Sequence, residues 1–573
     1  MTENGSVSVR SGDVVETATW FGPEDRPLFG WLTAPSSNLV RGAVVLCQPL
    51  AEEGNMAYRT MRTLSQELAR VGLLALRFDY DGTGDSAGEF NDPGRRDAWI
   101  GSVREAVEYT RSICAGRVTL VGMRLGANIA FHATEDVEVD ELLLWDPCES
   151  GNSFLRELRL VHSPWLEGRE RSPEGWIETP SYAFSPESAE AVRDLGLHDA
   201  GQSRAPLAVT WLARSDRPIP NKVRAALGGK APVLIDGQAG LLNVPTLSAA
   251  VPSASVSWIV RHLEDSRGGE GLVEVVPRVT AAASWLNWSG ARFGTQASPP
   301  TRVLESARVF DTGADVFGIV SESAAAPDGA PWVVFPNVAK ERHLGEGRQW
   351  VTLARALAAH GFRCLRFDHS GVGDSGAHPG QDEEATYSLY WLDDLDRIVT
   401  LIRSGGARRV VGIGLCSSGS AVLEAALKGK LTEAITINTF LLLEPGSEPG
   451  PPSQWRSFRR MPRPLRRLAR RHRRTARSLY KALGTICPPV SPLWVPRQIV
   501  RRSHCDLTLM VGADDSAQLD VGRPLDVMVR RPLERTGHFE IVALANADHS
   551  LRVTSGQDEV SRHVLERLLR ATT

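Results

Sequence analysis

Residues 68–86 read LARVGLLALRFDYDGTGDS, and residues 357–375 read LAAHGFRCLRFDHSGVGDS. Both stretches carry LA, LRFD and GDS at the same internal spacing, and the second follows the first by 289 residues. This distance is far longer than the period of a solenoid repeat, so it indicates a duplicated domain. A chain of 573 residues is also too long for a single hydrophobic core. We therefore expect two domains of similar size.

The composition is ordinary for a globular protein, with 42% hydrophobic residues and a net charge of -3. This charge gives no bulk attraction to nucleic acid. No apolar run is long enough to span a membrane, and the polar start is unlike a secretory signal. The seven cysteines are scattered, with no spacing typical of zinc sites or disulfide frameworks. We expect a cytoplasmic protein without a metal, cofactor or nucleic-acid partner.

Short apolar segments alternate with amphipathic helices in both halves, which is typical of a parallel sheet covered on both faces. In the first half the expected strands include 42–47, 141–145 and 206–212, and in the second half 332–335, 440–443, 507–511 and 539–545. The expected domains are 1–268 and 301–573, joined by a connecting segment at 269–300.

Each half contains an irregular insertion, at about 148–205 and about 445–505, where we expect a lid over the site. The second insertion has eleven arginines between 456 and 477, and no Asp or Glu from 449 to 505. Like charges at this density repel one another unless they meet a partner. A cationic lid suits an anionic acyl substrate, a phosphopantetheine carrier or an acidic carrier protein.

In each half an apolar strand ends in a turn rich in glycine, GMRLG at 122–126 and GLCSSG at 414–419. A nucleophile on such a turn needs small residues two positions before and after it, because the backbone bends tightly there. Cys416 meets this condition with Gly414 and Ser418. The following helix would point its N-terminus at the sulfur and stabilise a thiolate. Cys416 is the predicted nucleophile, and the alternative is a buried structural cysteine.

These motifs resemble the α/β-hydrolase superfamily over nearly the whole chain, twice. The first half resembles one type of hydrolase associated with the exosortase A system, in PLAEEGNMAYR at 49–59, GMRLGA at 122–127 and GWIETPSYAFSP at 175–186. The second half resembles the other type, in RFDHSGVGDS, GLCSSG and the positions of Asn337, Gly345 and Arg348. It departs from that type at Ala339, where the type has glycine, and at Arg342-His343, where the type has His-Arg. The resemblance implies two tandem α/β domains, each with a mostly parallel, doubly wound sheet and a helical lid.

The resemblance also implies the partners of Cys416. The base belongs after the last strand, where His549 lies, and the acid belongs after the preceding strand, where Asp515 has the usual spacing. Asp514 and Glu444 are alternative acids. The oxyanion hole would use the N–H of Ser417 and a second N–H near Asn337 or Val338. An equally weighted alternative is that Asn337 caps its own loop.

The first half lacks this machinery. Arg124 replaces the nucleophile and cannot act as one, since its guanidinium stays protonated. No histidine occurs between His198 and His262, while Asp216 fills the acid position and Gln48 aligns with Asn337. We expect an Arg124–Asp216 ion pair in a retired site, with capture of a ligand carboxylate or phosphate by Arg124 as the alternative.

The predicted function is a cysteine-dependent acyl hydrolase or acyltransferase acting on an ester, thioester or amide, with the first domain as a pseudo-hydrolase. One alternative is a non-catalytic binding or scaffold protein. Another is a peptidase that uses the same triad. The sequence leaves the substrate, the acyl acceptor and the oligomeric state open.

Overall fold

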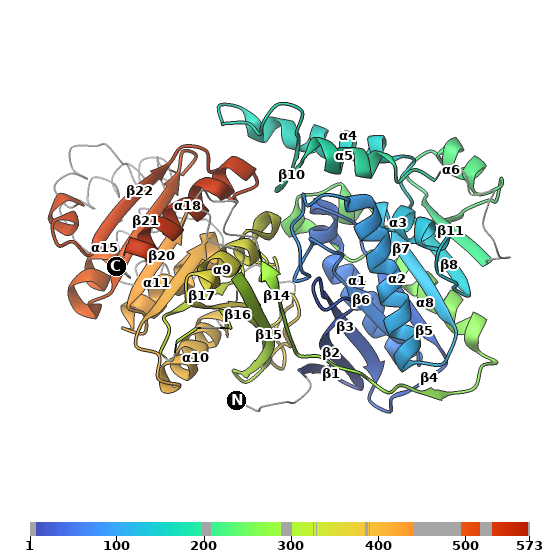
Figure 1. The fold of residues 1–573 in the computed structure, drawn as a ribbon, viewed down its shortest axis with the longest axis horizontal. Helices are drawn as coiled ribbons and strands as arrows, with labels where there is room; N and C mark the ends of the chain where they lie inside the picture. The colour runs from blue at the N-terminus through green and yellow to red at the C-terminus, as the bar shows by residue number, and fades with distance from the viewer. Residues whose placement is uncertain are drawn as a thin grey trace, which may run out of the picture. The chain divides into compact units, whose positions relative to one another are not determined.

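The computed structural model describes residues 7–197, 208–287, 301–324, 326–327, 329–383, 388, 390–439, 494–515 and 530–570. Contacts within the chain divide it into two compact units, Met1–Val309 and Phe310–Thr573. Each unit is described by itself below (Figure 1).

The first unit is built on a nine-stranded sheet with the order β1-β2-β3-β6-β5-β7-β8-β11-β12. Its first three strands pair antiparallel, as do β3 and β6, and all later neighbours pair in parallel. The bounds are β1 Ser8–Ser11, β2 Val14–Phe21, β3 Leu28–Pro35, β5 Ala43–Cys47, β6 Leu74–Phe78, β7 Val118–Met123, β8 Glu141–Trp145, β11 Ala208–Arg214 and β12 Val233–Ile235.

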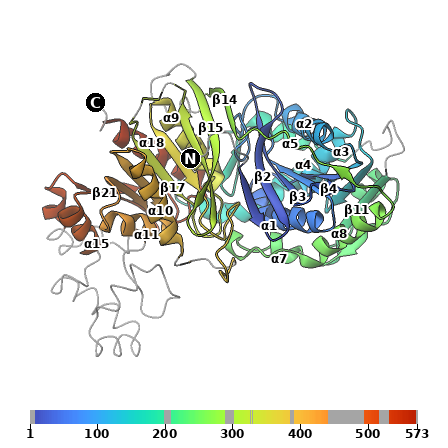
Figure 2. The same ribbon diagram turned by 90° about the horizontal axis from the view of Figure 1, so that it is seen from below.

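Helices cover both faces of this sheet. On one face, α1 (Glu52–Arg70) packs beside α8 (Ser253–Arg267), and on the other α2 (Arg95–Ile113) packs beside α3 (Leu125–Ala133) (Figure 2). A separate apolar core lies on each side of the central strands. Because both faces are covered, strands such as β5 are buried at every position.

Short elements surround this frame. Most of the expected first insertion forms α4 (Gly151–His162), the hairpin of β9 (Ile177–Thr179) and β10 (Tyr182–Phe184), and α5 (Pro186–Arg193). The remaining short elements include α6 Asn221–Ala226, α7 Ala239–Leu242, and β4 Leu39–Val40, which pairs antiparallel with β13 Val273–Glu274.

The second sheet repeats the pattern, with the order β14-β15-β16-β18-β17-β19-β20-β21-β22. Strand β16 pairs antiparallel with β18, and the strands beyond β18 are parallel. The bounds are β14 Ala282–Asn287, β15 Thr301–Asp311, β16 Asp315–Ser323, β17 Trp332–Pro336, β18 Arg363–Phe367, β19 Val410–Leu415, β20 Glu433–Ile437, β21 Asp506–Gly512 and β22 Phe539–Leu544.

On this sheet, α9 (Gln349–Ala359) contacts α18 (Thr554–Arg570), while α10 (Tyr390–Ser404) packs beside α11 (Cys416–Leu427) on the other face (Figure 2). The second insertion is described only from α15 (Trp494–Gln498) onward. Its arginine-rich part lies outside the described residues.

One expected strand was misplaced. The strand after α11 is β20, whose residues TEAITIN surround Glu433–Ile437, rather than 440–443. The run at 440–443 is more uniformly apolar, but it is β20 that pairs with β19 and β21 and so continues the sheet. Residues 440–443 lie outside the described part of the chain.

The expected fold class is confirmed: the chain has two tandem α/β domains with mostly parallel sheets. The two sheets agree even in detail, because Gly30 pairs with Phe78 and Gly318 pairs with Phe367 at the same antiparallel step. A Cβ on either glycine would lie 2.8 Å from a carbonyl oxygen of the neighbouring strand. None of the described helices has the length and apolar character needed to cross a bilayer.

This close approach predicts that Gly318→Ala destabilises the second unit by about 1–3 kcal/mol, because the added methyl group overpacks the sheet. The control is Gly240→Ala in α7, where a Cβ meets no atom within 4 Å. Calorimetric unfolding of both variants checks the prediction. Equal unfolding temperatures would show that the sheet adjusts to the methyl group.

Candidate active site

Cys416 lies where β19 turns directly into α11. Its backbone is left-handed, with φ of +48°, as is that of Arg124 at the same point of the first unit, with φ of +55°. This conformation is costly for residues with a side chain and persists only where the surroundings enforce it. Both units therefore share the strained strand-to-helix bend on which a nucleophile can be presented.

Close backbone contacts and a serine hold this bend. A Cβ on Gly414 would lie 2.6 Å from the backbone of Ser418 and Gly419, so only glycine fits there. The Oγ of Ser418 accepts the N–H of Leu415 at 3.0 Å and donates to the carbonyl of Leu415 at 2.9 Å. The small residues predicted around Cys416 thus let the backbone approach itself closely at the bend, and Ser418 stabilises the bend through its two hydrogen bonds.

Three side chains from distant parts of the sequence converge beside the bend. The Nε2 atom of His549 lies 3.3 Å from the Sγ of Cys416, and its Nδ1 lies 2.8 Å from Oδ2 of Asp515. All three residues follow the carboxyl ends of parallel strands, β19, β21 and β22, which meet at one edge of the sheet. The arrangement has the geometry of a nucleophile, a base and an orienting acid.

The surroundings of His549 favour its protonated form. Burial disfavours the charged ring, but the hydrogen bonds to Asp515 and Cys416 outweigh this and raise the pKa of His549 to about 10. An imidazolium beside the sulfur stabilises a thiolate electrostatically. The pair can therefore attack as a thiolate and deliver a proton from Nε2.

The structure distinguishes the three candidate acids by position. Asp515 is 7% exposed and contacts the ring of His549, whereas Asp514 is exposed. Glu444 lies outside the described residues. The geometry favours Asp515 because a buried acid at hydrogen-bond distance can fix the orientation of the imidazole.

The loop after β17 is braced mainly by Asn337. Its Nδ2 donates to the carbonyls of Ala339 and Glu341, at 2.9 and 2.8 Å, and its Oδ1 accepts the N–H of His369 at 2.7 Å. Its own backbone N–H donates to Phe367. Asn337 therefore has the loop-capping role, and its N–H does not point to an oxyanion, which corrects the expectation that it could be a donor.

Two other N–H groups fit an oxyanion hole better. Ser417 lies in the first turn of α11, where helix N–H groups lack intrahelical acceptors. The described part of the chain offers the N–H of Val338 no hydrogen-bond acceptor. Ala339, also left-handed with φ of +48°, donates its N–H to the Oγ of Ser417 at 3.0 Å and so ties this loop to the elbow.

Beneath the loop lies the group of described residues best arranged to hold a metal ion: His343, Asp368 and Asp374 have ligand-type atoms within 4.8 Å of one another. The carboxylate of Asp368, however, already accepts the backbone N–H of His343 and of Asp374 at 2.6 and 2.9 Å. It also contacts the ring of His343 at 2.9 Å. Asp368 therefore has a structural role, in which it links the loop that carries His343 to the loop that carries Asp374. The sequence motifs gave no sign of this role.

The corresponding position of the first unit is filled by a charge cluster around the buried Arg124. Arg124 donates to Glu53 from both Nε and Nη2, at 3.1 and 3.0 Å, and to Glu157 at 2.8 Å. It also lies 3.4 Å from Asp146. Burial raises the pKa of Glu53 and of Asp146, although the charge of Arg124 opposes this. Glu53 belongs to the PLAEEGNMAYR motif, so its position, but not its partner, was visible in the sequence.

The expected Arg124–Asp216 ion pair was wrong. Asp216 instead pairs with Arg214 two residues earlier, through contacts of 2.9 and 2.6 Å. The guanidinium of Arg124 instead donates hydrogen bonds to carboxylates of α1 and α4. Gln48 braces its loop by donating to Asp79 at 2.9 Å, much as Asn337 braces the loop in the second unit.

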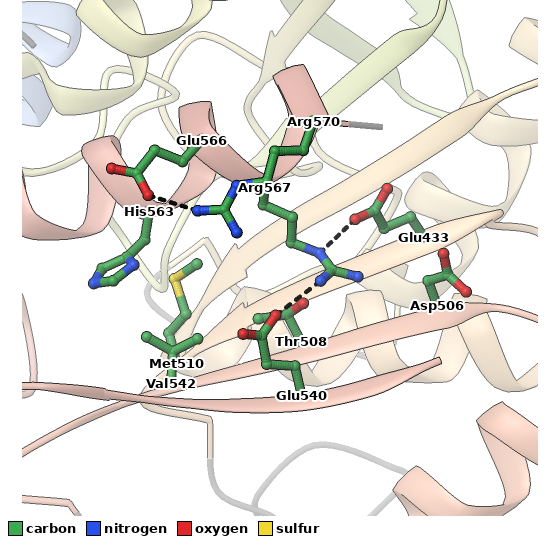
Figure 3. A pocket seen from close by; sticks show the side chains of 10 residues that line it. All are labelled: Glu433, Asp506, Thr508, Met510, Glu540, Val542, His563, Glu566, Arg567 and Arg570. Carbon is green, nitrogen blue, oxygen red and sulfur yellow. Dashed lines mark hydrogen bonds and ion pairs between the residues drawn. The ribbon is translucent and has the colours of Figure 1, made fainter. Parts of the chain in front are cut away.

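A groove of about 280 Å³ lies at the opposite edge of the second sheet, between its last strands and α18 (Figure 3). Arg567 bridges Glu433 and Glu540 there, at 2.7 and 2.9 Å, and Arg570 pairs with Glu566. Glu433 and Asp506 begin β20 and β21, whereas the Cys416 site follows the other ends of these strands. The groove is thus separate from the Cys416 site, and its arginine side chains pair with carboxylates that also line it.

Comparison with known proteins supplies one family match: residues 329–570 match the model of the alpha/beta hydrolase family. A search of curated protein sequences found no match. Similar solved structures include Est1E from Butyrivibrio proteoclasticus with ferulic acid bound, at 14% identity over 44% of this chain and 99% of that one, with a TM-score of 0.32. The Pyrococcus furiosus esterase PF2001 has 16% identity over 52% and 97% of the two chains, with a TM-score of 0.31. The thioesterase domain from the curacin biosynthetic pathway has 17% identity over 46% and 98%, with a TM-score of 0.27.

The charge cluster predicts that Arg124→Met lowers the free energy of unfolding by about 3–5 kcal/mol, because it leaves buried carboxylates without their cation. Glu53 and Asp146 have a raised pKa in the folded state, so their contribution to stability is full below the ordinary carboxyl pKa and is lost as the pH rises. The loss should therefore be smaller at pH 5 than at pH 8, and Glu53→Gln should restore part of it. Urea unfolding at both pH values is the measurement. A pH-independent loss would argue against buried carboxylates as its cause.

The raised pKa of His549 predicts that its ring stays protonated through neutral pH and titrates near 10. Its contribution to stability is full below the ordinary pKa of about 6.5 and is lost as pH rises toward 10. Histidine-selective NMR reports the titration, and Cys416→Ala should lower the midpoint by removing one hydrogen-bond partner. A wild-type midpoint near 6.5 would exclude the imidazolium pair.

Proposed function

We propose that the second unit is a cysteine-dependent acyl hydrolase or acyltransferase that acts on an ester, thioester or amide. The observation that carries this proposal is the His549 ring, with Nε2 at 3.3 Å from Cys416 and Nδ1 at 2.8 Å from Asp515. The match of residues 329–570 to the alpha/beta hydrolase family supports the same reaction class.

In the first half-reaction the thiolate of Cys416 attacks the acyl carbonyl carbon, and the carbonyl electron pair moves to oxygen. The N–H groups of Ser417 and Val338 stabilise this oxyanion. As the tetrahedral intermediate collapses, the bond to the leaving group breaks and His549 donates its Nε2 proton to that group. The products are a thioacyl-enzyme and a neutral imidazole.

In the second half-reaction His549 takes a proton from water, or from an amine or alcohol acceptor, as that group attacks the thioester carbon. The C–S bond then breaks, and the thiolate and imidazolium are restored. Asp515 keeps Nδ1 protonated and the ring aligned through both steps. A thioester intermediate exchanges its acyl group readily, so transfer to an acceptor is as accessible as hydrolysis.

The first unit is proposed to be a pseudo-hydrolase. Arg124 occupies the nucleophile position, and its contacts with Glu53 and Glu157 leave no group there that can attack a carbonyl. The cluster satisfies the polar groups of an enclosed site, as buried charges require.

The exposure of Cys416 supports its selective chemistry. Of the six cysteines that the structure describes, Cys416 is partly exposed and the others are buried. Burial also raises the pKa of the Cys505 thiol, to about 12. The thiolate is the nucleophilic form, so these buried thiols are poorly reactive.

We predict that iodoacetamide labels Cys416 first and abolishes hydrolysis of a model thioester. His549→Ala should lower the turnover of the thioester by about 100- to 10 000-fold, the usual contribution of general acid–base catalysis. Peptide mapping locates the label, and comparison of thioester, ester and peptide substrates separates an acyl hydrolase from a peptidase.

The matched control is His538→Ala. His538 also contacts a carboxylate through Nδ1, at 2.7 Å from Asp506, but lies at the start of β22 rather than after its end. It should keep full activity. Equal labelling of all cysteines, with no effect of His549→Ala, would instead favour the non-catalytic binding protein.

A further inference from the structure

Asn438 is the first residue after β20 and occupies the centre of the edge at which the candidate triad assembles. Its side chain is buried, at 2% exposure, and its backbone is left-handed, with φ of +47°. Its N–H donates to the carbonyl of Met510 at 2.9 Å, which continues the pairing of β20 with β21.

The side-chain amide of Asn438 joins the two loops that carry the acid and the base. Its Nδ2 donates to the carbonyls of Asp548 and His549, at 2.9 and 3.0 Å. Its Oδ1 accepts the N–H of Gly512 at 2.7 Å. Gly512 ends β21, three residues before Asp515. The amide of Asn438 thus fixes the backbone of His549 relative to Gly512, where the loop that carries Asp515 begins.

The space between these loops leaves little freedom for adjustment. A Cβ on Gly512 would lie 2.4 Å from the carbonyl oxygen of Ala547, so the two loops touch through backbone atoms. Asp548 fixes the far side of the base loop by accepting the N–H groups of Ser550 and Val553. The backbone of His549 is therefore held from both sides, and Asn438 makes the link toward the acid.

The first unit has the same backbone geometry at this point but a different side chain. Asp146 follows β8, has φ of +48° and donates its N–H to the carbonyl of Leu212 at 2.9 Å. Its carboxylate lies 3.4 Å from Arg124. A carboxylate cannot donate to two carbonyl groups as the amide of Asn438 does. As at the nucleophile position, the two units therefore share the backbone conformation here but carry side chains of different chemistry.

We propose that Asn438 is a positioning residue of the second unit, which holds the base and acid loops together so that the His549 ring reaches both Cys416 and Asp515. This inference rests on the proposed function. A displacement of a catalytic group by about 1 Å can cost on the order of 100-fold in rate, so loss of the three hydrogen bonds should affect chemistry more than binding.

The test compares Asn438→Gly and Asn438→Asp with the wild-type chain. Glycine accepts the left-handed backbone while removing all three side-chain bonds, and aspartate keeps the shape but removes both donors. Both variants should lower the midpoint of the His549 titration toward its ordinary pKa and slow alkylation of Cys416 by about 10- to 100-fold. With a thioester substrate, kcat should fall while KM changes little.

The matched control is Asn128→Ala in the first unit. Asn128 is also fully buried, and its side chain donates to the carbonyls of Cys148 and Leu195 and accepts the N–H of Cys148. Its loss removes the same number and kind of bonds from the first unit, so both readouts should stay at the wild-type value.

Measurements are made where circular dichroism shows each variant to be folded. If either folded Asn438 variant keeps the wild-type titration and alkylation rate, this inference is overturned while the proposed function stands. If the wild-type chain itself shows an ordinary His549 midpoint and no selective alkylation of Cys416, the proposed function fails instead.

Discussion

A single imidazole ring connects Cys416, whose backbone has φ of +48°, to the buried carboxylate of Asp515. His549 contacts Cys416 through one nitrogen and Asp515 through the other. The three residues are far apart in the sequence, and they meet because parallel strands end at one edge of the sheet. The raised pKa of His549 follows from these two contacts, since burial alone would lower it. The proposed chemistry depends on this ring keeping both partners.

The two units show how the same scaffold can enclose different chemistry. In both, a left-handed residue follows the strand that leads into the bend, β7 or β19, and a second one follows the neighbouring strand, β8 or β20. In the second unit these positions hold a thiol and an amide, and in the first they hold Arg124 and Asp146. An enclosed polar position must be compensated. The first unit achieves this with carboxylates around one guanidinium.

Much of the fold was predictable because its signals are local. The repeated LRFD and GDS segments and the apolar strands predicted two α/β domains, and the small residues around Cys416 predicted the bend. The grouping of Cys416, His549 and Asp515 in the candidate site was predictable as far as residue order determines it. The partners of Arg124 and the brace around Asn438 depend on which side chains meet after folding. The apolar run at 440–443 is the stronger local strand signal, so the sequence does not indicate that Asn438 directly follows a strand.

The proposed pairing of Cys416 with His549 is tested most directly by the ultraviolet absorbance of the thiolate at neutral pH. We predict a thiolate band in the wild-type chain that disappears on alkylation of Cys416 and is missing from His549→Ala. A wild-type chain without this band, or a band that persists in His549→Ala, would contradict the pairing and with it the proposed acyl chemistry.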